Sequence, residues 1–170
     1  ITHLVSDLAQ SSVFSELDAT NAFQMCVLAD DDGPVPSSEQ LAFTLPNGKR
    51  YAYKRLTFGV KDASFTFQRI MNSVLRDCMG WASVYIDDVI VHNGKAGSDP
   101  GTAIDEHIDR LEMVLHTLAD SGAKPRSTKT KILRRSTPAL GHHIENHTVT
   151  VSPDKPAALR DPRATTPPIS

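Results

Sequence analysis

Two adjacent carboxylates, Asp87 and Asp88, lie between short apolar, β-branched runs in the stretch Val84–Val91. This pattern predicts a β-hairpin with an acidic tip. Because neighbouring carboxylates repel each other, their charge must be relieved by solvent, by protonation or by a cation. Asp is also common in tight turns, so the pair taken alone favours a solvated hairpin tip. Its chemistry therefore depends on what surrounds it.

A third carboxylate, Asp18, ends a segment of alternating apolar residues that predicts a strand over Val13–Asp18. Taken alone, Asp18 is a strand-end cap or a turn residue. If this strand and the acidic hairpin are neighbours in one sheet, the carboxylates of Asp18 and Asp87 reach the same edge. The intervening hairpin and helix can return the chain to that edge.

A basic run forms the second chemical feature. The chain has 170 residues, enough for one domain with a substantial core, and a net charge of −2, which gives no overall reason to expect a polyanion partner. Between Asp120 and Glu145 there is no acid, and six cations gather there: Lys124, Arg126, Lys129, Lys131, Arg134 and Arg135. Such a local basic face suits phosphate, although a solvated surface is the default interpretation.

Several classes of protein are disfavoured by composition. Cys26 and Cys78 have no motif spacing, which argues against a disulfide framework and a Cys-rich zinc site and fits a reducing compartment. No apolar run approaches the roughly 20 residues needed to span a bilayer, so no membrane partner is expected. The sequence has no signal peptide and begins at Ile1 rather than at Met, and we interpret it as an excerpt from a longer polypeptide.

The segments before the acidic hairpin form mixed elements. Periodicity predicts a short helix over His3–Gln10, whereas Phe23–Leu28 is compatible with an extended or a helical conformation. Residues 29–40 form a loop, and its acidic run Asp30-Asp31-Asp32 lacks the downstream Glu of a calcium-binding loop. Two strands and an amphipathic helix with Asp62 as N-cap follow, at Leu41–Thr44, Tyr51–Tyr53 and Ala63–Met79.

The segments after the acidic hairpin complete the order of elements. A loop over Gly94–Gly101 leads to a second amphipathic helix, which Thr102 caps and Gly122 ends. Residues 132–151 hold short strand-like pieces, and residues 152–170, with five prolines, are irregular or begin a truncated element. This order predicts an α+β fold, in which an antiparallel sheet is backed by helices.

Five short motifs, in this order and spacing, resemble the palm of the reverse transcriptases of gypsy-type LTR retrotransposons, which are related to retroviral enzymes. The motifs are Phe14-Ser15-Glu16-Leu17-Asp18, Phe58-Gly59-Val60, Phe67-Gln68, Tyr85-Ile86-Asp87-Asp88 and Leu140-Gly141-His142. Glu106-His107, heading the second helix, also matches. The resemblance implies a polymerase palm with partial fingers over residues 1–151, and only the start of the thumb, or a linker, over residues 152–170.

The resemblance also implies an activity. An RNA-directed DNA polymerase joins a primer 3′-hydroxyl to the α-phosphate of a dNTP, with pyrophosphate leaving. Two divalent ions about 4 Å apart can activate the hydroxyl and stabilise the leaving oxygens. Mg²⁺, with Mn²⁺ as a substitute, needs only two or three carboxylates when substrate phosphates supply further ligands. By resemblance, Asp18, Asp87 and Asp88 are the catalytic metal ligands.

Further residues receive substrate roles by the same resemblance. Phe23 lies under the sugar of the incoming nucleotide, where its bulk rejects a 2′-hydroxyl, and Gln68 contacts the nucleotide or the template. Phe58 and Gly59 bring the backbone close to the nucleotide, a task that suits Gly because it has no Cβ. Tyr85 faces the primer end. Without the resemblance, Phe23 is an ordinary core residue, Gln68 a solvated polar residue and Tyr85 a packing residue.

The C-terminal motifs complete the implied site. Lys129 meets phosphate or pyrophosphate charge, and Leu140, Gly141 and His142 form a turn that grips the primer. His142, His143 and His147 also raise the possibility of a zinc site, but no Cys or carboxylate nearby completes the ligand set.

The implied partners are an RNA or DNA template with its primer, dNTPs and the rest of a retroelement polyprotein, including RNase H and integrase. The implied location is intracellular, in a cytoplasmic virus-like particle or in the nucleus. Departures from the family pattern, such as Ala22 for Gly and Thr57 for Pro, suggest a divergent or decaying element copy. Two alternatives stay open: a non-catalytic nucleic-acid-binding remnant that uses Lys124–Arg135, and a metal-dependent nuclease built on Asp18 and Asp87.

Overall fold

The computed structural model describes residues 2–19, 22–28, 41–57 and 59–151. The predicted loop over residues 29–40 and the Pro-rich segment 152–170 lie outside these residues. Along the chain, the helices and strands are α1 (Thr2–Ala9), β1 (Val13–Asp18), β2 (Ala42–Thr44), β3 (Arg50–Ala52), α2 (Ala63–Val74), β4 (Ala82–Tyr85), β5 (Asp88–Asn93), α3 (Pro100–Asp120), β6 (Lys131–Arg134), β7 (Ser136–Ala139), β8 (His142–Glu145) and β9 (Thr148–Val151). Among the described helices, none has the length and apolar character needed to cross a bilayer.

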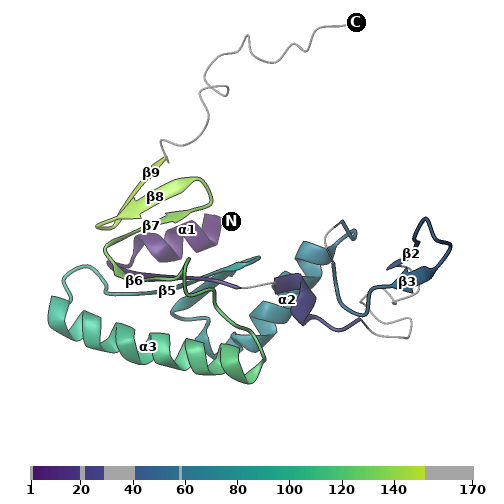
Figure 1. Cartoon of the computed structure of the whole chain (residues 1–170). Helices are drawn as coiled ribbons and strands as arrows, with labels where there is room; N and C mark the ends of the chain where they lie inside the picture. Colours follow the sequence, from purple (N-terminus) through teal and green to yellow (C-terminus); the bar gives the residue numbers. More distant parts are fainter. Residues whose placement is uncertain (1, 20–21, 29–40, 58, 152–170) are drawn as a thin grey trace, which may run out of the picture.

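The main sheet has four antiparallel strands in the order β4-β5-β1-β6. Helix α3 lies against β5 and β1, and α2 lies against β4 (Figure 1). On the opposite face, α1 and a small sheet of β7, β8 and β9 cover the strands. This arrangement confirms the predicted α+β fold, an antiparallel sheet backed by helices.

The two faces of the main sheet belong to different hydrophobic clusters. On the helix side, Leu17, Val89 and Val91 pack with residues of α2 and α3. On the other side, Phe14 and Ile90 pack with residues of α1, β7 and β8. Because successive side chains of a strand point to opposite faces, a sheet covered on both faces requires apolar residues at nearly every position. This requirement explains the three consecutive apolar residues of β5, Val89, Ile90 and Val91.

Helix α2 ends earlier than the sequence pattern predicts. It stops at Val74, and a 3-10 turn over Arg76–Cys78 follows. Leu75 and Cys78 are both buried, and a spacing of three residues suits a 3-10 turn as well as an α-helix, so the pattern alone does not separate them. Asp62 is at the N-cap position, as predicted, but it has a left-handed conformation and its side chain makes no capping hydrogen bond.

Helix α3 begins one turn earlier than predicted. Its N-cap is Asp99, whose Oδ2 accepts hydrogen bonds from the Thr102 backbone nitrogen (2.9 Å) and the Thr102 hydroxyl (3.1 Å). Pro100 occupies the first helical position, where its missing N–H has no cost. Thr102 is therefore the partner of the cap rather than the cap. The helix ends at Asp120, just before Gly122, as expected.

Between β1 and α2 the chain forms a 3-10 helix, an isolated bridge and a two-stranded hairpin. A 3-10 helix over Ala22–Met25 resolves the ambiguous segment, and Val27 then pairs with Arg55 in an isolated antiparallel bridge. Strands β2 and β3 form the predicted hairpin, with bounds that differ slightly from the predicted ones. The hairpin stands apart from the main sheet, beyond α2 (Figure 1).

Candidate active site

The three candidate aspartates lie at one end of the main sheet. Asp18, the last residue of β1, is directly opposite Asp88, the first residue of β5. The backbone nitrogen of Ala19 donates a hydrogen bond to the carbonyl oxygen of Asp87 at 2.9 Å. Asp87 itself lies in the tight turn that joins β4 to β5, where Ile86 has a φ of +53°. The antiparallel pairing of β1 and β5 thus brings Asp18 to the acidic turn, as the sequence predicts.

Burial and mutual repulsion destabilise the charge on this acidic group. The pKa of the Asp87 carboxyl is raised by desolvation and then by the charge of Asp18, whereas Lys129 lowers it. The pKa of Asp88 is raised by desolvation and by the charges of Asp18, Asp87 and Glu16. Such a cluster of oxygen donors gains stability when a cation approaches, and hard divalent ions prefer these ligands.

Two basic side chains already contact Asp18. The Lys129 Nζ donates a hydrogen bond to Asp18 Oδ2 at 3.1 Å, and Arg126 Nε lies 3.6 Å from Asp18 Oδ1. The Arg126 backbone nitrogen also donates to the Asp18 carbonyl oxygen at 2.8 Å. The predicted basic run therefore reaches the site, and Lys129 lies at a carboxylate, where it can also meet phosphate.

The acidic residues include a carboxylate oxygen without a partner, although their side chains are not arranged as a complete metal site. Within the described ranges, no three Asp, Glu, His or Cys side chains converge as metal ligands. The Oδ1 atom of Asp87, however, is buried and has no hydrogen-bond partner among the described residues. A buried acceptor without a partner is costly, and a cation would satisfy it. The residues present therefore fit a divalent ion.

A cavity of about 360 Å³ opens at this end of the sheet. Its lining joins the acids to the basic run: Glu16, Leu17, Asp18, Asp88, Thr128, Lys129 and Lys131. Glu16 was not among the residues singled out from the sequence. It accepts hydrogen bonds from Lys131 Nζ at 2.8 Å and from the Thr137 hydroxyl at 3.0 Å. Its position two residues before Asp18, on the same strand face, is the signal that identifies it.

Gln68 contacts the acidic turn. Its Oε1 accepts a hydrogen bond from the Ile86 backbone nitrogen at 2.7 Å, and its Nε2 donates to the Val84 carbonyl oxygen at 3.0 Å. The Nε2 also donates to Asn72 Oδ1 at 2.9 Å. The amide thus joins α2 to β4 and to the first residue of the turn that carries Asp87. A contact between Gln68 and a nucleotide or template stays a prediction.

The predicted nucleotide-contacting residues lie near α2. The Phe23 side chain is buried and packs edge-to-face against Phe67, with ring centroids 5.5 Å apart. Gly59 has a φ of +85°, which explains the need for Gly, and a Cβ at this position would meet no described atom within 4 Å. Phe58 lies outside the described residues. The substrate roles of Phe23, Phe58 and Gly59 therefore stay predictions.

The predicted primer-gripping turn lies beside the acidic hairpin. Leu140 and Gly141, with φ values of +51° and +77°, connect β7 to β8, which begins at His142. A cavity of about 130 Å³ is lined by residues of both hairpins, of α1 and of β1: Leu4, Glu16, Tyr85, Asp88, Ile90, Pro138, Ala139 and Leu140. Tyr85 and Leu140 thus face a shared space, while Gly141 and His142 do not line it.

The comparisons with known proteins decide the family. Residues 2–144 match the family described as "Reverse transcriptase (RNA-dependent DNA polymerase)". The chain belongs to this family. Reverse transcriptases are nucleotidyltransferases and generally use divalent metal ions.

The relatives of this reverse transcriptase region include transposon and plant-virus polyproteins. The retrovirus-related Pol polyprotein from transposon gypsy of Drosophila melanogaster is 28% identical over 162 residues, which cover 95% of this chain and 14% of the relative. The corresponding polyprotein from transposon opus is 29% identical over 162 residues, covering 95% and 15%. The enzymatic polyprotein of Soybean chlorotic mottle virus is 28% identical over 141 residues, covering 82% and 19%. These matches confirm the resemblance to gypsy-type elements.

Solved structures show the same fold. A foamy viral protease-reverse transcriptase in complex with ds DNA superimposes with a TM-score of 0.71 at 24% identity, covering 89% of this chain and 25% of that chain. The foamy viral protein in complex with an RNA/DNA hybrid gives a TM-score of 0.68 at 23% identity, covering 88% and 19%. The likeness establishes the polymerase palm fold of this region.

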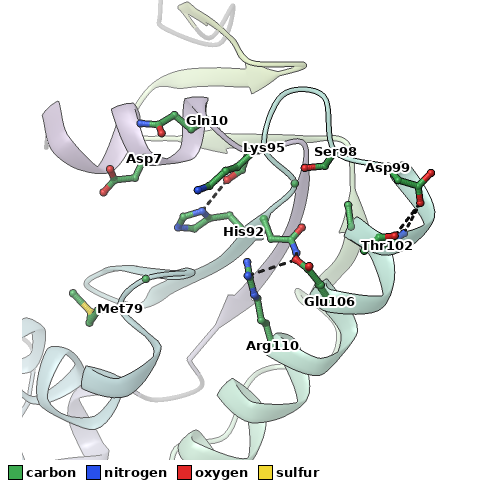
Figure 2. A pocket seen from close by; sticks show the side chains of 15 residues that line it. Asp7, Gln10, Met79, His92, Lys95, Ser98, Asp99, Thr102, Glu106 and Arg110 are labelled. Carbon is green, nitrogen blue, oxygen red and sulfur yellow. Dashed lines mark hydrogen bonds and ion pairs between the residues drawn. The ribbon is translucent and has the colours of Figure 1, made fainter.

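A cavity of about 540 Å³ lies away from the carboxylates of the reverse transcriptase region. It is at the Asn93 end of β5, between α1 and the start of α3, whereas the acids lie at the Asp88 end. Figure 2 shows side chains of both charges around it, including Asp7, Lys95 and Arg110. The length of β5 therefore separates this cavity from the acidic residues at the other end of the strand.

The three histidines considered for zinc, His142, His143 and His147, do not form a metal cluster among the described residues.

Proposed function

We propose that this chain is the catalytic palm of an RNA-directed DNA polymerase that transfers nucleotides from dNTPs to a primer 3′-hydroxyl. The observation that carries the proposal is the meeting of Asp18, Asp87 and Asp88 at one end of the main sheet. Family membership supports it independently. The chain spans only 14–15% of the transposon polyproteins that it matches, so the activity of the whole protein is part of the proposal.

The three aspartates would hold two Mg²⁺ ions, or Mn²⁺ in their place. The ions would supply activation of the primer hydroxyl and stabilisation of the leaving pyrophosphate. The chain's own residues position the reactants: β1 and β5 fix the carboxylates, and Gln68 holds the turn that carries Asp87. No protein nucleophile is needed, because positioning and charge stabilisation account for this type of phosphoryl transfer.

Lys129 changes partner in this proposal. In the structure, it neutralises Asp18 through the 3.1 Å contact. With a divalent ion held by Asp18, the Lys129 ammonium would be free to meet a substrate phosphate. Phe23 would then exclude a 2′-hydroxyl, Tyr85 would face the primer end, and the turn at Leu140–His142 would hold the primer strand.

The proposed partners are those that the family resemblance implies. A template of RNA or DNA with its primer, dNTPs and the remaining regions of a retroelement polyprotein, with RNase H and integrase, would act together with this palm. Residues 152–170 would begin the thumb or a linker. An intracellular location, in a cytoplasmic particle or the nucleus, suits such an element.

Primer extension tests the proposal. A polypeptide carrying this chain should incorporate dNTPs on a primed RNA template, and Asp87→Asn should reduce incorporation at least about 100-fold, because an amide cannot replace an anionic metal ligand. Glu112→Gln is a matched control, since Glu112 lies on the exposed surface of α3 and contacts only His116 among the ion pairs. Thermal unfolding checks that both variants fold.

Two results would contradict the proposal. Equal incorporation by the wild type and Asp87→Asn would show that this carboxylate is not a metal ligand. Salt-dependent binding of primer-template, with no incorporation by the wild type in Mg²⁺ or Mn²⁺, would instead identify a non-catalytic binding remnant.

A further inference from the structure

Strands β2 and β3 present a row of exposed aromatic rings. Phe43 and Tyr51 are directly opposite each other in the hairpin, and Tyr53 lies two residues beyond Tyr51, so the three side chains share one face. The ring centroids of Phe43 and Tyr51 are 6.0 Å apart, and those of Phe43 and Tyr53 are 5.4 Å apart. The exposed fractions are 41%, 46% and 47%. We call these three residues the aromatic face.

The same hairpin is strongly basic. From residue 41 to residue 61 the sequence has no acid and five cations: Lys49, Arg50, Lys54, Arg55 and Lys61. Lys49, Arg50 and Lys54 are exposed, and none of these three forms an ion pair with another residue in the part of the chain that the structure describes. They flank the aromatic face along the chain, because Arg50 precedes Tyr51 and Lys54 follows Tyr53.

We propose that the aromatic face of the β2–β3 hairpin binds an unpaired nucleic-acid strand, the template beyond the primer terminus. Exposed rings offer stacking surfaces to any base, and neighbouring cations meet the phosphates. Bases in a duplex are already stacked and paired, so this surface selects unpaired nucleotides. A protein segment seated on the rings would need no excess of positive charge around them, whereas a polyanion does.

Hydrogen bonds fix the base of the β2–β3 hairpin to the segment after Phe23, the residue proposed to lie under the sugar of the incoming nucleotide. The Leu28 backbone nitrogen donates to the Lys54 carbonyl oxygen at 3.1 Å, and the Leu56 nitrogen donates to the Cys26 carbonyl oxygen at 2.9 Å. Arg55 Nη1 also donates to the carbonyl oxygens of Gln24 and Met25, at 3.1 and 3.3 Å. These contacts join the base of the hairpin to the segment that carries Phe23. The role as a template surface rests on the proposed polymerase function.

Affinity measurements with a 20-nucleotide single strand and a blunt duplex test the stacking. Replacing both tyrosines (Tyr51→Ala with Tyr53→Ala) should weaken single-strand binding about tenfold or more and leave duplex binding unchanged. The conservative pair Tyr51→Phe with Tyr53→Phe should bind as the wild type, because the rings remain. Met113→Ala, which removes a half-exposed apolar side chain from α3, is a control for surface change.

Two further readouts locate the strand. Lys49→Gln and Lys54→Gln should each reduce the slope of log K against log salt by roughly 0.7, the value for one lost single-strand phosphate contact. A strand carrying 5-iodouracil should form photo-cross-links in the tryptic peptide Tyr51–Lys54. Cross-links confined to peptides that contain none of Phe43, Tyr51 and Tyr53 would overturn the proposal.

The remaining outcomes distinguish a nucleic-acid strand from a protein segment on the aromatic face. They also distinguish failure of this inference from failure of the proposed catalytic function. If a protein segment covers the rings, the alanine pair should lower the melting temperature without weakening single-strand binding, and the inference is then wrong. Equal losses for strand and duplex would also overturn it. Asp87→Asn should still bind the single strand. If Asp87→Asn extends primers normally while the alanine pair loses single-strand binding, the proposed catalytic site fails and the binding surface stands.

Discussion

At the residue scale, a side-chain amide of α2 contributes to holding the acidic turn. Ile86 adopts a left-handed conformation with a φ of +53°, which costs a β-branched residue about 1–2 kcal/mol. Gln68 bonds both the Ile86 nitrogen and the Val84 carbonyl oxygen, and so stabilises this conformation from outside the hairpin. The orientation of Asp87, the next residue, therefore depends on a side chain of α2.

Gln68→Leu should destabilise the fold and slow catalysis. The substitution leaves the partly buried Ile86 N–H without its acceptor, which should lower the free energy of unfolding by about 1–3 kcal/mol in urea denaturation. If the turn positions Asp87, kcat should fall more than KM rises in primer extension. Asn72→Ala is a matched control, because it removes only the second acceptor of Gln68 Nε2. Equal effects of the two substitutions on stability and kcat would contradict the positioning role.

Residue types predicted the site better than they predicted its connections. Asp18 and Asp87 were identifiable from the order and spacing of the five motifs, because each carboxylate taken alone favours a strand end or a solvated turn. The partner of Gln68 was not, because a hydrogen bond across 18 positions depends on how α2 packs on β4. The contact of Lys129 with Asp18 likewise joins residues 111 positions apart. Side-chain pairs of this kind follow from the tertiary fold rather than from local patterns.

At the element scale, most helices and strands follow from periodicity, whereas their ends depend on specific capping groups. Asp99 and Thr102 are both common N-cap residues, and sequence pattern placed the cap at Thr102. The structure selects Asp99, since Pro100 is favoured at the first helical position and excluded from the interior. The 3-10 turn after α2 was missed for a similar reason, because α- and 3-10 helices share the spacing of Leu75 and Cys78.

Asp99→Ala should destabilise α3 more than Thr102→Val does. The first substitution removes both hydrogen bonds at the helix start, whereas the second keeps the backbone donor and the cap. A decrease of about 2–4 °C in melting temperature is expected for Asp99→Ala. Differential scanning calorimetry measures it, and a larger decrease for Thr102→Val would show that Thr102 is the cap after all.

At the scale of the whole molecule, two buried histidines join the layers. His107 of α3 is hydrogen-bonded through Nε2 to the Ser15 hydroxyl of β1 at 2.8 Å. His92 of β5 contacts the hydroxyls of Ser11 and Ser83, at 3.0 and 3.2 Å. Desolvation lowers the pKa of each histidine from 6.5 to about 4, with a further contribution from nearby positive charge, notably Arg110. Both imidazoles are therefore neutral in the folded protein near pH 7.

Stability should fall as the pH decreases below about 6.5. The unfolded chain takes up protons on these histidines below pH 6.5, and the folded chain does so only near pH 4. Between these values the unfolded state binds more protons, so each histidine lowers the free energy of unfolding by about 1.4 kcal/mol per pH unit. Urea denaturation between pH 7.5 and 5 measures the slope. His107→Gln should flatten it, and an unchanged slope would contradict the assignment.

The order of strands in the sheet has a consequence for synthesis of the protein on the ribosome. β1 pairs with β5 on one side and with β6 on the other, and Glu16 and Lys131, which contact each other across the second pair, are 115 positions apart. A nascent chain that has emerged only as far as α3 therefore exposes β1 as an open edge, with the Asp18 carbonyl lacking its Arg126 partner. Unpaired edges favour association between incomplete chains. The strand that carries Asp18 is thus made before its partner β6 and is enclosed only after β6 has emerged.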